Sequence, residues 1–367
     1  MKKLLMISTD RKIFEEGSAV RARQVEYAKK YDEVRIVIFT TSKFKVQSAT
    51  SAENESAKQG VSQQRASVRI SANCWAYPTL SSFKFLYPLE AIKLGKSIIE
   101  KKGITEITCQ DSSLTAMAGV SLKKRFNIPL EIQIHEDIGS PYYGRTLSHK
   151  IRKMLALRYI PQADKIRAVS ERIKTYLESA VLPPLRKGTA HDRGNSPLPQ
   201  IEVRPIFVDV NRIRNAPVTV DLRAKYPRFE KVALMASRLE SEKNIELAMH
   251  SWPEVLKSMP KAGLVIVGSG SQASKLEARS SKLGMASHIV FEPWADPATL
   301  ASYYKTADLF VVTSFCEGYG MTLVEAQAAG CPIVSTDVGV AKEVGASIIG
   351  HADPAEAAAA IVRSLNR

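Results

Sequence analysis

The strongest constraint on the fold is a regular alternation of strand-length apolar runs with helix-length amphipathic segments. Parallel strands need a crossover between them, and this crossover is usually a helix, so the alternation is typical of parallel sheets covered by helices. Strands are expected at residues 3–8, 34–40, 68–75, 104–110, 130–135, 165–170, 231–236, 264–267 and 308–313, and helices at 18–30, 82–101, 112–126, 146–159, 245–256, 322–329 and 354–365. The pattern therefore predicts an α/β protein.

The length of 367 residues, 45% of them hydrophobic, allows two domains with separate cores. We expect an N-terminal domain over residues 1–205, a C-terminal domain over 206–353 and a closing helix over 354–367, with the interdomain linker beginning near residue 203. Polar composition predicts exposed loops at 41–66 and 183–200.

The sequence also favours a cytoplasmic protein. It contains no apolar run of about 18 residues, which a membrane span would need. The basic start is followed by too short an apolar stretch for a signal peptide. Four cysteines, at positions 74, 109, 316 and 331, lack metal-ligand spacing, so we expect reduced thiols.

A strand, a glycine-rich turn and a helix follow one another over residues 308–332. Gly318 and Gly320 permit a tight turn with close approach of a ligand. The first helical N–H groups, near Met321 and Thr322, lie at the positive end of the helix dipole. This place suits an anion, and a diphosphate best.

Two carboxylates flank this expected phosphate position. Glu317 precedes the helix and Glu325 lies inside it, so the two can meet hydroxyls on opposite sides of the phosphates. A nucleoside diphosphate sugar has hydroxyls on both sides. The alternative is that Glu317 is a turn carboxylate and Glu325 a solvated helix residue.

Two cations follow another expected strand of the C-terminal half. Arg238 can hold phosphate oxygens bidentately, and Lys243 supplies a point charge. Loops at the carboxyl ends of parallel strands form the ligand crevice of open α/β sheets. We therefore expect both cations in the same crevice as Glu317, although such residues alone are more often surface charges. A further strand ends at Gly268 in a G-x-G turn, which is a weak signal by itself.

Together these segments resemble the family 4 retaining glycosyltransferases of the GT-B fold, over most of residues 230–345. The matching segments are Ser237-Arg238 with Lys243, Val267-Gly268-Ser269-Gly270, Ala307-Asp308, Glu317-Gly318-Tyr319-Gly320 with Glu325, Ala329-Gly330-Cys331-Pro332 and Thr336-Asp337-Val338-Gly339. The resemblance implies two Rossmann-like domains facing each other across a cleft. It also implies that Arg238 and Lys243 hold the diphosphate, Glu317 meets the donor sugar and Glu325 takes the ribose diol.

The base of the donor is less well defined. The resemblance implies main-chain contacts from residues 291–294, which places Glu292 and Trp294 in the expected donor site. Many relatives have a small residue where this chain has Glu292 and Pro293. The base therefore stays open, with UDP favoured over GDP.

The N-terminal half contributes further candidates. Gly17 precedes an expected helix whose N-terminus can face a phosphate, and an ordinary N-cap is the alternative. His135 ends an expected central strand, where a lone histidine is more often structural. The resemblance, however, implies a place for His135 near the donor sugar and its scissile bond. Glu136 and Asp137 are expected to position the acceptor.

Charge is divided unevenly. Residues 1–205 hold 35 Lys and Arg against 20 Asp and Glu, a net +15, whereas residues 206–367 hold 17 of each. An expected helix carries Lys150, Arg152 and Lys153 beside apolar residues, which is typical of a helix lying on an anionic membrane. The alternative is that these charges only keep the domain soluble. Nucleic acid is not expected, because no helix-turn-helix, RNA-stacking or zinc pattern accompanies the charge.

The resemblance implies transfer, with retention, of a hexose or N-acetylhexosamine from a nucleotide diphosphate sugar to a hydroxyl of a glycan or lipid-linked acceptor. Cations and the helix N-terminus can stabilise the leaving diphosphate. No cofactor or metal is expected, since the crevice segments contain no D-x-D pattern. We expect a cytoplasmic protein that can lie on the inner face of the cytoplasmic membrane. A nonhydrolysing nucleotide-sugar epimerase, a sugar-phosphate-accepting synthase and a non-enzymatic scaffold remain as alternatives.

Relatives commonly continue beyond the segment that matches residues 354–365 and cross back to the N-terminal domain. The end of this chain at Arg367 therefore predicts unusually free domain motion.

Overall fold

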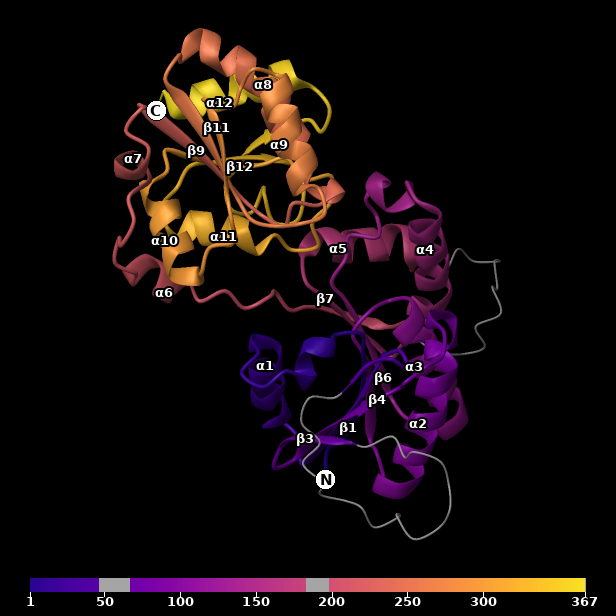
Figure 1. Ribbon diagram of the computed structural model, residues 1–367. Helices are drawn as coiled ribbons and strands as arrows, with labels where there is room; N and C mark the ends of the chain where they lie inside the picture. Colours follow the sequence, from indigo (N-terminus) through magenta and orange to yellow (C-terminus); the bar gives the residue numbers. More distant parts are fainter. Residues whose placement is uncertain (46–66, 183–197, 367) are drawn as a thin grey trace. The chain divides into compact units, whose positions relative to one another are not determined.

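The computed structural model describes residues 1–45, 67–182 and 198–366. Contacts between residues divide the chain into two compact units (Figure 1). The first unit consists of Met1–His135 and Gly144–Arg204, and the second of Glu136–Tyr143 and Pro205–Arg367. The sequence assigned residues 136–143 to the N-terminal domain, whereas their contacts group this loop with the second unit.

An eight-stranded sheet forms the centre of the described part of the first unit, in the order β3-β4-β2-β1-β5-β6-β7-β8. All neighbouring strands run parallel except β3 and β4. The strands are β1 (Lys3–Ser8), β2 (Glu33–Ile38), β3 (Val68–Ser71), β4 (Cys74–Pro78), β5 (Glu106–Cys109), β6 (Leu130–Ile134), β7 (Lys165–Ala168) and β8 (Gln200–Val203).

Helices cover the two faces of this sheet unequally. Leu5 points toward α2 at Gly95, whereas its neighbours Leu4 and Met6 join the apolar cluster beneath α1. Helix α3 packs beside α2 against β1, β5 and β6. The helices are α1 (Ala19–Ala28), α2 (Tyr87–Lys102), α3 (Leu114–Phe126), α4 (Leu147–Tyr159) and α5 (Glu171–Tyr176).

Two strand predictions need correction. The single strand expected over 68–75 is wrong, because β3 and β4 form an antiparallel hairpin there. The Asn73 amide fixes the turn by donating to Ala28 O and Tyr31 O, both at 2.9 Å. Strand β8 was not predicted, since its neighbourhood is polar. The loops expected at 41–66 and 183–200 lie mostly outside the described residues.

The second unit has a parallel sheet in the order β11-β10-β9-β12-β13-β14. One face packs around Trp252 and the other around Tyr304 and Phe310, whose rings meet edge to face at 5.1 Å. The strands are β9 (Lys231–Ala236), β10 (Ala262–Val267), β11 (Ile289–Glu292), β12 (Leu309–Val312), β13 (Ile333–Thr336) and β14 (Ser347–Ile349). The helices are α6 (Val210–Asn215), α7 (Leu222–Lys225), α8 (Ile245–Ser258), α9 (Ala273–Lys282), α10 (Pro297–Thr306), α11 (Met321–Ala328) and α12 (Pro354–Leu365).

The predicted α/β architecture with parallel sheets is confirmed, and strand order defines where a ligand is expected. In the second unit the chain runs outward from β9 through β10 to β11 and then returns to the other side of β9 as β12. Ligands of open α/β sheets bind outside the carboxyl ends of the strands at such a reversal. No helix in the described residues is both long and apolar enough to cross a membrane.

Candidate active site

Lys243 and Glu317 meet at the reversal between β9 and β12. Lys243 ends a 3-10 helix in the loop after β9, and Glu317 lies in the loop after β12. Lys243 Nζ lies 2.6 Å from Glu317 Oε1, although the residues are 74 apart in sequence. Their side chains are only 13% and 17% exposed. Ser314 Oγ donates to the same carboxylate oxygen at 2.8 Å. The structure thus brings together the two segments that the sequence assigned to one crevice.

Hydrogen bonds to backbone carbonyls hold the two loops together. Thr313 Oγ1 lies 3.2 Å from Lys243 O and donates to Asn244 O at 2.9 Å. Phe315 N donates to Glu242 O at 2.8 Å. Asn244 adopts a left-handed conformation with φ 47°, which asparagine tolerates better than most residues, and helix α8 begins directly after it. The two loops that carry Lys243 and Glu317 are therefore hydrogen-bonded directly to each other.

Arg238 lies on the same loop and remains exposed. Its Nη2 lies 2.7 Å from Oε1 of Glu242, which is four residues further along the loop. An exposed ion pair of this kind contributes little stability, so the guanidinium can change partners at low cost. Gly268 closes the neighbouring β10 loop with φ 149°, and a Cβ there would lie 1.9 Å from Ser237 O. Only glycine fits this close approach.

The glycine-rich turn ends at the start of α11. Gly320 has φ 87° and caps the helix, and no side chain caps its first N–H groups. Val340 N donates to Tyr319 O at 2.9 Å and fixes the turn that contains Gly318. Met321 and Thr322, the expected phosphate contacts, form the first residues of this helix. The helix N-terminus thus lies at the carboxyl end of β12, on the edge that carries Lys243.

Glu325 lies on α11 and is half-buried. Tyr304 Oη donates to its Oε2 at 3.0 Å. Burial raises the pKa of Glu325, and the hydrogen bond from Tyr304 and the charge of Arg212 oppose this rise. A desolvated carboxylate gains by accepting hydrogen bonds from a ligand diol. The environment differs from that of a solvated helix residue.

The side chain of Glu292 is occupied by structural contacts. Lys225 Nζ lies 2.8 Å from it, Tyr303 Oη donates to it at 2.6 Å, and Tyr226 Oη also donates to it. These bonds attach α7 and α10 to the end of β11. The Glu292 carbonyl accepts from Gly268 N at 3.0 Å, and Trp294 is exposed just beyond β11. A base contact at this position would therefore come from the main chain or from Trp294.

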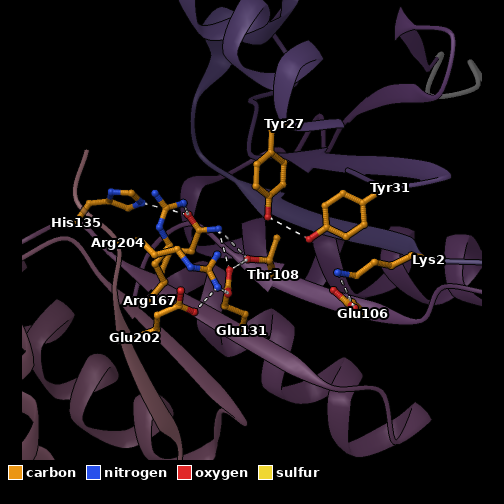
Figure 2. A network of polar contacts seen from close by, with 11 residues as sticks. Lys2, Tyr27, Tyr31, Glu106, Thr108, Glu131, His135, Arg167, Glu202 and Arg204 are labelled. Carbon is orange, nitrogen blue, oxygen red and sulfur yellow. Dashed lines mark hydrogen bonds and ion pairs between the residues drawn. The ribbon is translucent and has the colours of Figure 1, made fainter. Parts of the chain in front are cut away.

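His135 follows β6 in the first unit. Burial and, to a smaller extent, the charge of Arg167 lower its pKa to about 4, and the charge of Asp111 opposes both effects. Its Nε2 lies 3.4 Å from Gln133 Oε1, within the polar network of Figure 2. The imidazole is therefore uncharged at neutral pH.

The remaining candidates of the N-terminal half hold local structure. Gly17 has φ 77°, and the following Ser18 caps α1 by accepting from Arg21 N at 3.1 Å, which is the bond of an ordinary N-cap. Glu136 accepts a hydrogen bond from Tyr143 Oη. Asp137 is buried, and its Oδ1 accepts from Gly139 N at 3.1 Å.

The loop of residues 136–143 nevertheless packs against the segment that carries Glu317. The ring of Tyr142 stacks on Phe315 with centroids 5.3 Å apart. Ser140 Oγ donates to Phe315 O at 3.2 Å, and Tyr142 Oη lies 3.0 Å from Ser241 Oγ. This loop contact was not predicted, because nothing in the local pattern links Tyr142 to a residue so far along the chain.

Gln133 and Arg167 were not predicted as site residues. Polar residues alternate with apolar ones along β6 and β7, so the polar side chains of these strands lie on the same face of the sheet. This period of two was the available signal.

Comparison with known proteins supports the architecture. Residues 221–366 match the family described as glycosyl transferases group 1. The chain is 29% identical over 255 residues to an uncharacterised glycosyltransferase of Methanocaldococcus jannaschii, which covers 69% of this chain and 62% of that protein. It is 34% identical over 106 residues to the alpha-monoglucosyldiacylglycerol synthase of Streptococcus pneumoniae, which covers 29% of this chain and 24% of that protein. The chain thus spans less than two thirds of each of these relatives.

Sucrose-phosphate synthase from Thermosynechococcus elongatus has a similar structure, with a TM-score of 0.71 at 19% identity over 100% of this chain and 90% of that one. At this identity the likeness defines the fold. The chain has the GT-B fold of two Rossmann-like domains. The group 1 match falls within the second unit, which carries Lys243, Glu317 and Glu325.

The two carboxylates should respond differently to neutralisation. Glu325→Gln removes a charged acceptor, so we expect about tenfold weaker binding of UDP. Glu317→Gln keeps the side-chain size and frees Lys243 from its carboxylate, so UDP affinity should be unchanged or higher. Isothermal titration calorimetry with UDP and GDP measures both effects. Weaker binding by Glu317→Gln together with normal binding by Glu325→Gln would contradict these assignments.

The low pKa of His135 predicts a specific pH dependence of stability. The unfolded imidazole has a pKa near 6.5, so between pH 6.5 and 4 the unfolded chain binds more protons than the folded one. The free energy of unfolding should therefore fall by up to roughly 3 kcal/mol as the pH drops through this window. In His135→Gln this part of the loss should disappear. Urea-dependent hydrogen exchange in β5–β7 reports on the first unit, and equal pH dependence in both chains would show that His135 titrates normally.

Proposed function

We propose that this protein is a retaining glycosyltransferase. In this proposal it moves a hexose or N-acetylhexosamine from a nucleotide diphosphate sugar, with UDP favoured over GDP, to an acceptor hydroxyl in glycan or glycolipid assembly. The observation that carries the proposal is the Lys243–Glu317 pair, which lies at the strand reversal of the unit that matches group 1. The glycosyltransferase relatives and the GT-B fold support it.

The Lys243–Glu317 pair suggests how a donor would be received. Without a donor, each residue neutralises the other in a half-buried place. A diphosphate would replace Glu317 as the partner of Lys243, and the released carboxylate would accept hydrogen bonds from the donor sugar. Lys243, Arg238 and the α11 N-terminus would then stabilise the charge that develops on the leaving diphosphate.

His135 would act as a neutral group. Glycosyl transfer proceeds through a transition state with positive charge on the sugar, and a protonated imidazole beside it would raise its energy. The low pKa of His135 avoids this repulsion and leaves the ring able to accept or donate one hydrogen bond.

Incubation with a panel of nucleotide sugars, with and without glycans and lipid extract, tests the activity. We expect release of nucleoside diphosphate that depends on an acceptor. Arg238→Ala and Lys243→Ala should each lower kcat/KM by roughly tenfold to a hundredfold, since each loses a charge-assisted contact. The anomeric configuration of the product tests retention. Conversion of the donor without any acceptor would instead indicate an epimerase, and an unchanged rate in both variants would remove the proposed donor site.

A lipid-linked acceptor is favoured by the surface of α4. Leu147, Ile151 and Met154 lie on one face of this helix and are 75%, 45% and 60% exposed. The basic residues Lys150 and Arg152 are exposed beside them. An apolar stripe flanked by cations suits an anionic bilayer, and the excess charge of residues 1–205 strengthens the attraction.

Vesicle co-sedimentation tests this contact. The chain should bind vesicles that contain anionic lipid at low salt and bind less at near-physiological salt. Joint change of Lys150, Arg152 and Lys153 to Gln should weaken binding by at least about tenfold, at about 1 kcal/mol per basic residue. Ile151→Ser with Met154→Ser should also weaken it. Joint change of Lys93, Lys96 and Lys101 on α2 removes the same charge elsewhere and is the control. Equal binding to neutral and anionic vesicles, or none at all, would leave a soluble acceptor.

A further inference from the structure

One half of a sheet face in the first unit is polar. Residues of β5–β8 alternate, and those that point away from α2 and α3 are polar. Figure 2 shows Glu106, Thr108, Glu131, Arg167 and Glu202 among them. The row includes Glu106, Thr108, Glu131, Gln133, Lys165, Arg167, Gln200 and Glu202, and Arg204 and His135 extend it at the strand ends. An apolar helix face does not pack well on such a row, and the aromatic side chain beside it, Tyr27 of α1, interacts electrostatically with Glu131 and Arg167.

Most charges in this row have partners. Arg204 Nη2 lies 2.6 Å from Glu202 and 3.4 Å from Glu131. Glu131 Oε1 also accepts from Thr108 Oγ1 and from Gln133 Nε2, both at 3.2 Å. The acidic side chains beside Arg167 are therefore already satisfied by other groups.

Arg167 is different. Its Nη1 reaches Gln133 Oε1 at 3.5 Å, the limit of a hydrogen bond. Its Nε is buried without an acceptor. Within the described residues, no carboxylate lies at ion-pair distance from its guanidinium. A buried donor on a charged group without a partner is costly, and native proteins rarely retain one without a reason.

The Nε–Nη2 edge of Arg167 has the donor geometry that suits an oxyanion. Because Gln133 engages Nη1, the parallel N–H groups of Nε and Nη2 remain for a ligand. This edge binds two oxygens of a phosphate or carboxylate at once. Gln133 is only 2% exposed. Its Oε1 also lies 3.4 Å from His135 Nε2, so one amide holds the guanidinium and the imidazole next to each other.

We propose that Arg167 binds an oxyanion of the phosphate class carried by the acceptor. This inference rests on the proposed function, because it assigns the acceptor class to the unit that carries His135. The acceptor is then a phosphorylated hydroxyl compound whose anion binds Arg167 and whose hydroxyl lies near the imidazole. Gln133 is a positioning residue, since it touches both side chains and has no proposed contact with the ligand.

Inorganic phosphate is the probe for the site, because its binding can be measured without any transfer reaction. Calorimetry follows the affinity, and the Nε–H resonance of Arg167 in NMR spectra reports where phosphate binds. Arg167→Gln should weaken binding at this site by at least about tenfold, since it loses a charged bidentate contact. Lys165→Gln lies on the same strand and face, removes the same charge, and should leave the affinity unchanged.

Arg238→Ala separates this site from the donor site. Phosphate binding at Arg167 should persist in Arg238→Ala, whereas UDP binding should weaken there and persist in Arg167→Gln. Failure of the glycosyltransferase assay would leave this double comparison intact. Equal phosphate affinity in the native chain and Arg167→Gln, or no phosphate-induced shift of the Arg167 Nε–H resonance, would overturn the proposal.

Competition against phosphate distinguishes the two sources of the anion. One arm uses a soluble sugar phosphate and the other a short-chain lipid phosphate. Displacement by either one, together with loss of the effect in Arg167→Gln, supports the site and names the source. Displacement by neither would overturn a phosphorylated acceptor at Arg167.

Discussion

The parallel pairing of β9 with β12 is the constraint on which the candidate site depends. Parallel strands end at the same edge of a sheet, so the loops that follow them must meet there. Lys243 and Glu317 are 74 residues apart in sequence and yet lie 2.6 Å apart. Gly268 and Gly320 then provide the close approach and the open helix start that side chains with a Cβ would block. The charges are therefore placed by topology before any ligand binds.

The electrostatics of the Lys243–Glu317 pair allow its members to exchange partners. A half-buried ion pair gains little net stability, because desolvation opposes the attraction between its members. Its members can therefore accept new partners without a large loss, provided that each new partner offers a complementary charge or hydrogen-bond donors. A diphosphate meets this condition for Lys243, and sugar hydroxyls meet it for Glu317. Arg167 is the opposite case, because its charge lacks a carboxylate partner in the described structure and a bound anion would supply one without displacing another group.

The sequence predicted features that follow from period and spacing. The strands before Lys243 and Glu317 are apolar runs followed by polar loops, so their common edge followed from the pattern alone. The engagement of Glu292 by Lys225 and Tyr303 was not predictable, because these partners come from separate elements that only packing brings together. The hairpin of β3 and β4 was missed because Asn73 forms its turn through contacts to α1 and the residues after it. Arg167 carried a signal in the alternation of β7, yet its lack of a carboxylate partner is visible only in the structure.

The loop of residues 136–143 connects the backbone after His135 to the segment that carries Glu317. It leaves the first unit after His135, packs with Tyr142 on Phe315, and returns at Gly144. The chain consequently crosses between the units at three places, the third being at Pro205. The first crossing directly follows His135, so the backbone that carries the imidazole continues into the loop that packs on Phe315.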